Sequence, residues 1–213
     1  MFPVSNTLTR VAGLGLLAVI WPGLIGLVWL HRFFRLGLLA FTGLCALFLC
    51  LPARQSDSAS LRQAYVAGLT RYEGVAFIWG GESPKGVDCS GLIRRGLVDS
   101  LFLQGIQTFD AGLVRNSIRL WWHDCPARDL GEGREVTSRL FSTPSVNDLD
   151  QAKILPGDLA VTSSGSHVMA FLGDHHWIEA DPDIGRVIIV QVPSKNPWFR
   201  ARMNVVRWNM FGS

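Results

Sequence analysis

Three residues of this 213-residue chain have the types and the order that a thiol nucleophile needs. Cys89 lies in the run Asp-Cys-Ser-Gly, His167 lies in an apolar run well downstream, and Glu179 follows it. A thiolate can attack an amide carbonyl, an imidazole can act as its base, and a third polar group can hold that imidazole in one tautomer. The sequence therefore predicts Cys89, His167 and Glu179 as a catalytic triad.

The segment after Asp88 predicts a helix that begins at or just after Cys89. Apolar residues follow at helical spacing, at Leu92, Ile93, Leu97 and Phe102. At a helix N-terminus the unpaired amides and the helix dipole favour a thiolate, and the same amides can hold an oxyanion. The alternative interpretation is a buried structural cysteine, because free cysteines are commonly buried.

Two further helices are predicted around this one. Ser60 and Gln63 form a capping-box pattern ahead of apolar residues at helical spacing, after a short polar linker at residues 55–60. Residues 110–122 have the pattern of another helix. Residues 127–147 are polar and rich in glycine and charge, so we expect a surface excursion there.

From Pro156 onward the pattern is typical of strands. Short branched or aromatic runs, separated by turn residues, occupy residues 158–162, 167–172, 177–180, 186–192 and 203–208. Helices followed by a strand meander predict an α+β fold with one antiparallel sheet. On adjacent antiparallel strands, the 12-position separation of His167 and Glu179 can bring both side chains to one face of the sheet.

Trp121, Trp122 and His123 allow two interpretations. They could form a wall of a cleft, or they could be the apolar face of the preceding helix, since aromatics at helical spacing usually pack in a core. His123 and Cys125 lack partner residues at the spacing of a zinc site, so no metal and no other cofactor is predicted. Cys89 and Cys125 are both expected to be free thiols.

Residues 1–54 predict a two-helix transmembrane hairpin. Residues 11–30 carry no charge and would reach about 30 Å as a helix, the thickness of a bilayer core. A second apolar run follows, so we expect spans at about 11–30 and 34–51. A cleaved signal peptide is the alternative for residues 1–30, but the apolar stretch is too long and no convincing small-residue cleavage site follows it.

The distribution of charge predicts the orientation of this hairpin. Arg10, Arg32 and Arg35 are the only charged residues before Arg54, so the net charge of +3 comes from the hairpin. Basic loops favour the cytoplasm, which places the Arg32–Arg35 loop there and the rest of the chain outside. In the rest of the chain 17 basic residues balance 17 acidic ones, which argues against nucleic acid as a partner. The expected partner of the hairpin is membrane lipid.

Several blocks of the sequence closely resemble the NlpC-type papain-like cell-wall cysteine peptidases. They are FIWGG at residues 77–81, GVDCSGLI at 86–93, LPGDL at 155–159, SHVMAFLG at 166–173 and WIEA at 177–180. The resemblance covers residues 61–192 or thereabouts, and the blocks in this order are far more specific than any one alone.

This resemblance implies a papain-like domain at residues 55–213, in which a cysteine-bearing helix packs on an antiparallel sheet that presents the histidine. The stretch between cysteine and histidine is usually shorter in the family, so residues 121–147 would be an insertion. Cys89 would be the nucleophile, His167 the general base and Glu179 the third polar residue. The residues implied to line the substrate cleft are Phe77, Trp79, Asp88 and Ser90.

Two positions depart from the family pattern. Glu179 stands where many members have histidine, but a carboxylate can also accept the His167 N–H and stabilise imidazolium. Phe77 stands where a tyrosine is usual, so a hydroxyl near the oxyanion site is missing.

The function implied by the resemblance is that of a membrane-anchored cysteine peptidase. It would hydrolyse peptidoglycan stem peptides between D-glutamate and the diamino acid, in the cell (inner) membrane, with its catalytic domain facing the periplasm or the cell exterior. Two alternatives stay open: a thiol acyltransferase or amidase acting on lipid or protein, and a catalytically degenerate domain that binds the cell wall. The intact Cys89 and His167 count against the last of these.

Overall fold

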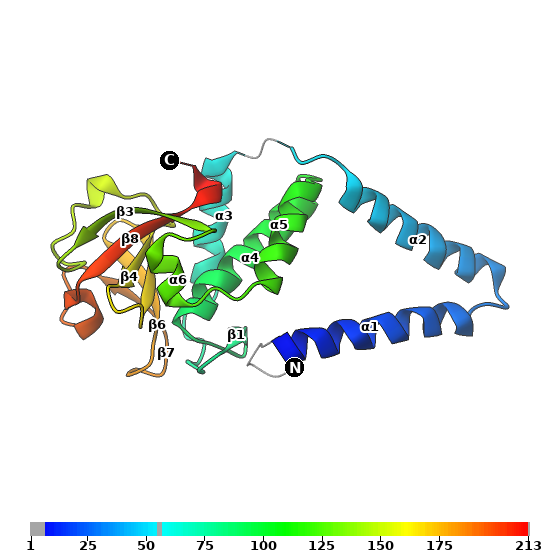
Figure 1. The fold of residues 1–213 in the computed structure, drawn as a ribbon, viewed down its shortest axis with the longest axis horizontal. Helices are drawn as coiled ribbons and strands as arrows, with labels where there is room; N and C mark the ends of the chain where they lie inside the picture. Colours follow the sequence, from blue (N-terminus) through cyan, green and yellow to red (C-terminus); the bar gives the residue numbers. More distant parts are fainter. Residues whose placement is uncertain (1–6, 55–56, 213) are drawn as a thin grey trace.

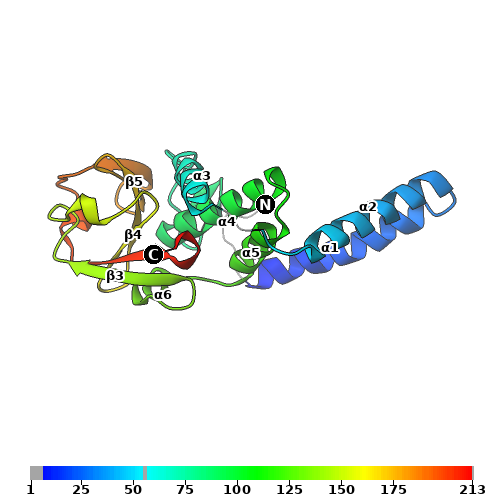
Figure 2. The ribbon, with the colours of Figure 1, turned by 90° about the horizontal axis from the view of Figure 1, so that it is seen from above.

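The two apolar runs at the N-terminus form a helical hairpin in the structure, a computed structural model that describes residues 7–54 and 57–212. The helices are α1 (Thr7–Leu27) and α2 (Arg32–Cys50), and they project together from one end of the rest of the chain (Figures 1 and 2). By length and composition both are able to cross a membrane. The first helix lies a few residues earlier than the predicted span at 11–30.

Three helices pack together next to this hairpin. They are α3 (Ser58–Thr70), α4 (Cys89–Gln107) and α5 (Ala111–Trp122), and the last two confirm the helices predicted there. The predicted capping residue of α3 is wrong. Asp57 caps this helix, because its carboxylate accepts the N–H groups of Ala59 at 3.1 Å and Ser60 at 3.2 Å.

The predicted linker at residues 55–60 is shorter than expected. Its first two residues, 55–56, lie outside the described residues, and Ser58–Ser60 already belong to α3. Close packing of α3 on α4 depends on glycine, since a Cβ atom on Gly68 would lie 2.5 Å from Ser100 Oγ.

One six-stranded antiparallel sheet forms the other half of the domain. Its order is β3-β8-β4-β5-β6-β7, and every neighbouring pair is antiparallel. The strands are β3 (Thr137–Thr143), β4 (Leu159–Thr162), β5 (Val168–Gly173), β6 (His176–Asp181), β7 (Arg186–Gln191) and β8 (Met203–Trp208). This sheet confirms the predicted α+β fold class and the five predicted strands.

The segment that was expected to be a surface excursion contributes to the fold instead. It contains the short helix α6 (Ala127–Glu132) and the edge strand β3, which pairs with β8 at both of its ends, with a shift in register between Arg139 and Phe141. Only Thr137 and Thr143 of β3 are buried, so the strand lacks the alternation of apolar residues by which strands are recognised. An edge strand is held largely by backbone pairing with its neighbour, which needs no apolar face.

The main core lies between the helices and one face of the sheet. It includes Tyr65 and Leu69 of α3, Ile93 and Leu97 of α4, and Trp208 of β8. A second buried cluster covers the opposite face of the sheet, where loop residues and Phe199 of the 3-10 helix η2 (Pro197–Arg200) pack on strand residues such as Met169 and Trp177. The sheet is therefore covered on both faces, which explains why its central strands are almost wholly buried.

Candidate functional site

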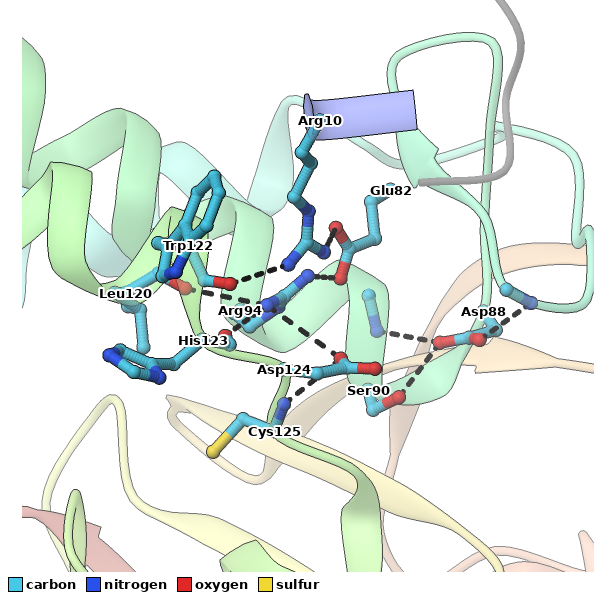
Figure 3. Close-up of polar contacts among 12 residues, drawn as sticks. Arg10, Glu82, Asp88, Ser90, Arg94, Leu120, Trp122, His123, Asp124 and Cys125 are labelled. Carbon is cyan, nitrogen blue, oxygen red and sulfur yellow. Dashed lines mark hydrogen bonds and ion pairs between the residues drawn. The ribbon is translucent and has the colours of Figure 1, made fainter. Parts of the chain in front are cut away.

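Cys89 lies at the first position of α4, and Asp88 determines that position. Asp88 Oδ1 accepts the Gly91 N–H at 2.6 Å and the Ser90 hydroxyl at 2.9 Å, while its Oδ2 accepts the Gly80 N–H at 2.8 Å (Figure 3). One carboxylate thus caps the helix and ties the preceding loop to its first turn. The predicted helix start is confirmed, and Cys89 is 6% exposed at this N-terminus.

Glycine is required at position 91, because the loop that precedes Cys89 lies very close to the first turn of α4. A Cβ atom on Gly91 would lie 2.0 Å from the carbonyl oxygen of Gly81, a separation that no side chain could accept. The loop reaches α4 through a short ribbon of β1 (Glu82–Ser83) and β2 (Gly86–Val87). The backbone around the cysteine is therefore packed too tightly to be changed without loss of this geometry.

His167 and Glu179 meet on neighbouring strands, as the strand pattern predicted. His167 directly precedes β5 and Glu179 lies in β6, and these two strands are paired. His167 Nε2 lies 2.6 Å from Glu179 Oε2, and the two residues are 1% and 0% exposed. Such a short, buried contact fixes the orientation of the imidazole ring.

Two residues that no sequence pattern predicted, Asn196 and Trp198, also hold this pair. Asn196 Nδ2 donates to Glu179 Oε1 at 2.8 Å and to Asp181 Oδ2 at 2.9 Å. The Trp198 ring stacks on the His167 ring, with centroids 4.3 Å apart and planes inclined by 21°. Asn196-Pro197 is recognisable as the start of a short helix, but no local pattern predicts that this helix folds against Glu179.

The electrostatic environment favours a charged imidazole. Burial lowers the pKa of His167, but hydrogen bonding and attraction to Cys89 and Glu179 outweigh burial and raise the pKa to about 9. Because Nε2 faces Glu179, Nδ1 is the ring nitrogen left for the thiol. Burial raises the pKa of Glu179, and the hydrogen bond with His167 acts in the opposite direction. Cys89 and Glu179 thus both contribute to the raised pKa of His167, which links the cysteine electrostatically to the His167–Glu179 pair.

The other predicted site residues lie on the loop before α4 or in its first turn. Phe77 is half-buried and meets the Trp79 ring edge-on, with centroids 5.1 Å apart. Trp79 is 72% exposed and is therefore accessible to a ligand. Ser90 and Asp88 are half-buried and bonded to each other, so the side chains of both already have partners within the protein.

Trp121 and Trp122 at the end of α5 differ in burial, so the core interpretation holds for only one of them. Trp121 is half-buried and packs against the main core, whereas Trp122 is 41% exposed. His123 and Cys125 belong to no cluster of three or more potential metal ligands within residues 7–54 and 57–212. All four cysteines of the chain are free, and burial raises the pKa of Cys125 to about 11.

A second buried charge cluster lies beside the site and was not foreseen. Glu82 in β1 forms ion pairs with Arg94 of α4 and, at 3.0 Å, with Arg10 of α1 (Figure 3). Arg94 also donates to the carbonyl oxygens of Leu120 and His123. Burial lowers the pKa of Arg94 to about 10, so it stays protonated at neutral pH.

A cysteine at the start of a helix, together with a histidine and a carboxylate on an antiparallel sheet, defines a papain-like domain. The chain belongs to the NlpC/P60 family, whose family model matches residues 74–207. This match confirms the family that the sequence blocks predicted. No curated protein is significantly similar to the chain in sequence.

Three solved structures that are similar to part of this chain serve as examples. NlpC1 from Trichomonas vaginalis has a TM-score of 0.45 and 18% identity, over 75% of this chain and 48% of that chain. The peptidoglycan hydrolase RipB from Mycobacterium tuberculosis has a TM-score of 0.45 and 20% identity, over 72% and 67% of the two chains.

The third is the NlpC/p60 domain of the peptidoglycan hydrolase SagA, with a TM-score of 0.39 and 26% identity, over 68% of this chain and 97% of that chain. The present chain spans about half the length of the Trichomonas vaginalis protein.

Proposed function

We propose that this protein is a membrane-anchored cysteine peptidase that hydrolyses amide bonds in peptidoglycan stem peptides. The observation that carries the proposal is the buried 2.6 Å contact between His167 Nε2 and Glu179 Oε2, on a histidine whose pKa is also raised by Cys89. Membership of the NlpC/P60 family supports cell-wall peptide as the substrate class. The bond to be cleaved is the one between D-glutamate and the diamino acid.

In the proposed mechanism the Cys89 thiolate attacks the carbonyl carbon of the scissile amide. The C–N bond then breaks, the amine leaves with a proton from the His167 imidazolium, and a thioester remains on the sulfur. Water attacks this thioester while neutral His167 accepts one of its protons, which releases the carboxylic acid and returns the thiolate–imidazolium pair. Glu179 fixes the ring and stabilises its positive charge throughout.

Backbone amides at the start of α4 are suited to hold the oxyanion. The first N–H groups of a helix have no partner within the helix, and the helix dipole adds partial positive charge there. Phe77 offers no hydroxyl, so the amides of Cys89 and Ser90 have to supply this stabilisation.

The proposed membrane anchor is supported by the way both hairpin helices meet the domain. Arg10 near the start of α1 donates to the Trp122 carbonyl oxygen at 2.9 Å, and Arg115 donates to the carbonyl oxygens of Leu49 and Leu51 at the end of α2. The domain therefore lies at the open end of the hairpin, and the basic loop lies at the other (Figure 1). With that loop in the cytoplasm, the domain faces the periplasm or the cell exterior.

The test is hydrolysis of purified muropeptides by the full-length protein in detergent. We expect new free amines, detected by mass spectrometry, and their complete loss in Cys89→Ala. Cys125→Ala is the matched control and should keep activity, because Cys125 is also buried and free, and none of the charged groups that influence its pKa belongs to the triad. Activity that survives in Cys89→Ala would refute the proposal.

Two further assays of the full-length protein distinguish the alternative functions. Turnover of acyl thioesters without hydrolysis of muropeptides would indicate an acyltransferase. A Cys89 thiol that reacts with iodoacetamide at about pH 6 no faster than a model thiol would indicate a degenerate binding domain.

A further inference from the structure

Helix α5 lies across the open end of the hairpin. Its last residue, Trp122, accepts a hydrogen bond from Arg10 of α1, at 2.9 Å. Near its other end Arg115 donates to the carbonyl oxygens of Leu49, at 2.6 Å, and Leu51, at 2.7 Å, where α2 ends. The two hairpin helices thus attach to opposite ends of α5 (Figure 1). If both helices cross a bilayer, α5 must lie along its surface.

The side of the domain next to α2 is strongly apolar. A groove of about 690 Å³, here called the junction groove, is lined by α2, by the end of α4 and by α5. Its lining includes Phe41, Leu44, Phe48, Phe102, Ile106 and Ile118. The exposed fractions of Phe102, Ile106 and Ile118 are 47%, 52% and 48%, although these three belong to the globular domain. The apolar surface of the hairpin thus continues onto α4 and α5 without a break.

The backbone conformation of Phe109 independently indicates that an exposed aromatic side chain is needed on this surface. It follows the C-terminal cap of α4 and adopts a left-handed backbone conformation, with φ at 55°. Its N–H bonds to Ile106 O and the next N–H, of Asp110, bonds to Gly105 O, which is the pattern that usually carries glycine at this position. The chain instead keeps a strained phenylalanine that is 59% exposed and contacts Phe48 of α2, with ring centroids 4.8 Å apart.

Arginines border the same surface. Arg115 and Arg119 lie about one turn apart on α5, on either side of Ile118 in the sequence, and α5 contains no acidic residue. Arg54 lies at the end of the segment leading from α2 and donates to the Thr108 carbonyl oxygen at 3.0 Å. None of these three arginines forms an ion pair with a carboxylate among the described residues.

We propose that α5 and the end of α4 form a lipid-docking face of the domain. Phospholipid acyl chains fill the junction groove, and their phosphate groups meet Arg54, Arg115 and Arg119. A helix with apolar and tryptophan side chains beside arginines has the character of a helix at the membrane interface. This inference rests on the proposed membrane anchor and extends it, because the domain is then held flat on the bilayer rather than at the end of a free tether.

Photo-crosslinking of the full-length protein in liposomes of phosphatidylethanolamine and phosphatidylglycerol tests the proposal. p-Benzoylphenylalanine is introduced at Ile118, and at Ile184 as a matched control, since these isoleucines are 48% and 51% exposed. We expect roughly fivefold more lipid adduct at position 118 than at 184. Equal yields at the two positions, or adducts at 118 to protein only, would overturn the docking face.

A third position distinguishes this failure from failure of the anchor. Leu16 lies within α1 and is 62% exposed. Lipid adducts at position 16 without adducts at 118 would reject the docking face and leave the anchor standing. No lipid adducts at 16 would reject the anchor, and the docking face with it.

Phe109→Gly checks the role of the strained residue. Glycine adopts the left-handed conformation freely, so the melting temperature in detergent should not fall, while lipid adduct at position 118 should fall roughly threefold. A lower melting temperature would mean that Phe109 serves the fold through Phe48, and an unchanged adduct yield would mean that it serves no lipid contact. Either result would contradict the role given to Phe109.

Discussion

Two glutamates in this domain, the buried Glu179 and the half-buried Glu82, have opposite kinds of partner. Glu179 is fully buried and meets His167 and Asn196, and the imidazole of His167 can gain or lose a proton. Glu82 has a side chain that is 12% exposed and meets Arg94 and Arg10, both of which stay charged. The first carboxylate can therefore support proton transfer, whereas the second can only hold segments of the chain together.

The largest expected effect is on activity, from Glu179→Gln. An amide cannot balance the charge of the His167 imidazolium, and its NH2 group would oppose the Asn196 NH2 that now donates to Glu179 Oε1. We expect kcat on muropeptides to fall roughly 10³-fold, or about 4 kcal/mol in the activation free energy. Steady-state kinetics measure it, with circular dichroism to show that the variant is folded. A fall of less than about tenfold would remove Glu179 from the proposed triad.

The matched substitution, Glu82→Gln, should affect stability instead. It leaves the buried Arg94 and Arg10 without their shared carboxylate, and loss of one partner of a buried ion pair costs about 3–5 kcal/mol. Urea denaturation measures the free energy of unfolding, while kcat of the folded protein should stay within about fivefold of the wild type. A large fall in kcat with unchanged stability would reverse the distinction between the two carboxylates.

The pH dependence of stability should report His167. Folding raises its pKa from 6.5 to about 9, so the folded protein holds this proton more tightly than the unfolded chain. The resulting stabilisation, about 3 kcal/mol, is complete below pH 6.5 and is lost as the pH rises through about 9.

The measurement is the free energy of unfolding of the wild type minus that of His167→Gln, followed from about pH 6 to pH 10. Over the same range kcat/KM should fall on an alkaline limb with a pKa of about 9, because neutral His167 cannot protonate the leaving amine. A difference in stability that stays constant across this range would show that His167 is not held as imidazolium.

The smallest expected effect comes from Asn196→Ala. Without the shared amide, the carboxylates of Glu179 and Asp181 face each other unscreened, and we expect kcat to fall about tenfold. Asn147→Ala is the control. It removes the bonds of Asn147 to the backbone of Ser194, in the same loop, and touches neither carboxylate. Equal losses in both variants would mean that Asn196 acts only by holding the loop.

The contacts of these two glutamates differ in how well the sequence predicts them. The His167–Glu179 contact was predictable, because His167 directly precedes one recognisable strand and Glu179 lies in the next, and these strands are neighbours along the chain. The Glu82 cluster was not, because Arg10, Glu82 and Arg94 come from three elements that no local pattern relates. Arg10 by itself suggested only a residue that flanks a membrane span.

The same distinction applies to the fold. The central strands were predicted from apolar alternation, but the edge strand β3 was missed because its polar side chains carry no such signal. The cap of α3 was placed at Ser60 instead of Asp57, since several polar residues in a row satisfy the same local rule.

The amino-acid sequence alone determined the family, the helix start at Cys89, the order of strands along the chain and the two apolar helices, because each depends on spacing between residues close in the chain. Only the tertiary structure decided that Asn196 and Trp198 surround the His167–Glu179 pair. It alone also showed that α5 joins the two ends of the hairpin. Such contacts form when the whole chain is packed, and their free energy comes from burial and pairing of groups that lie far apart in the sequence.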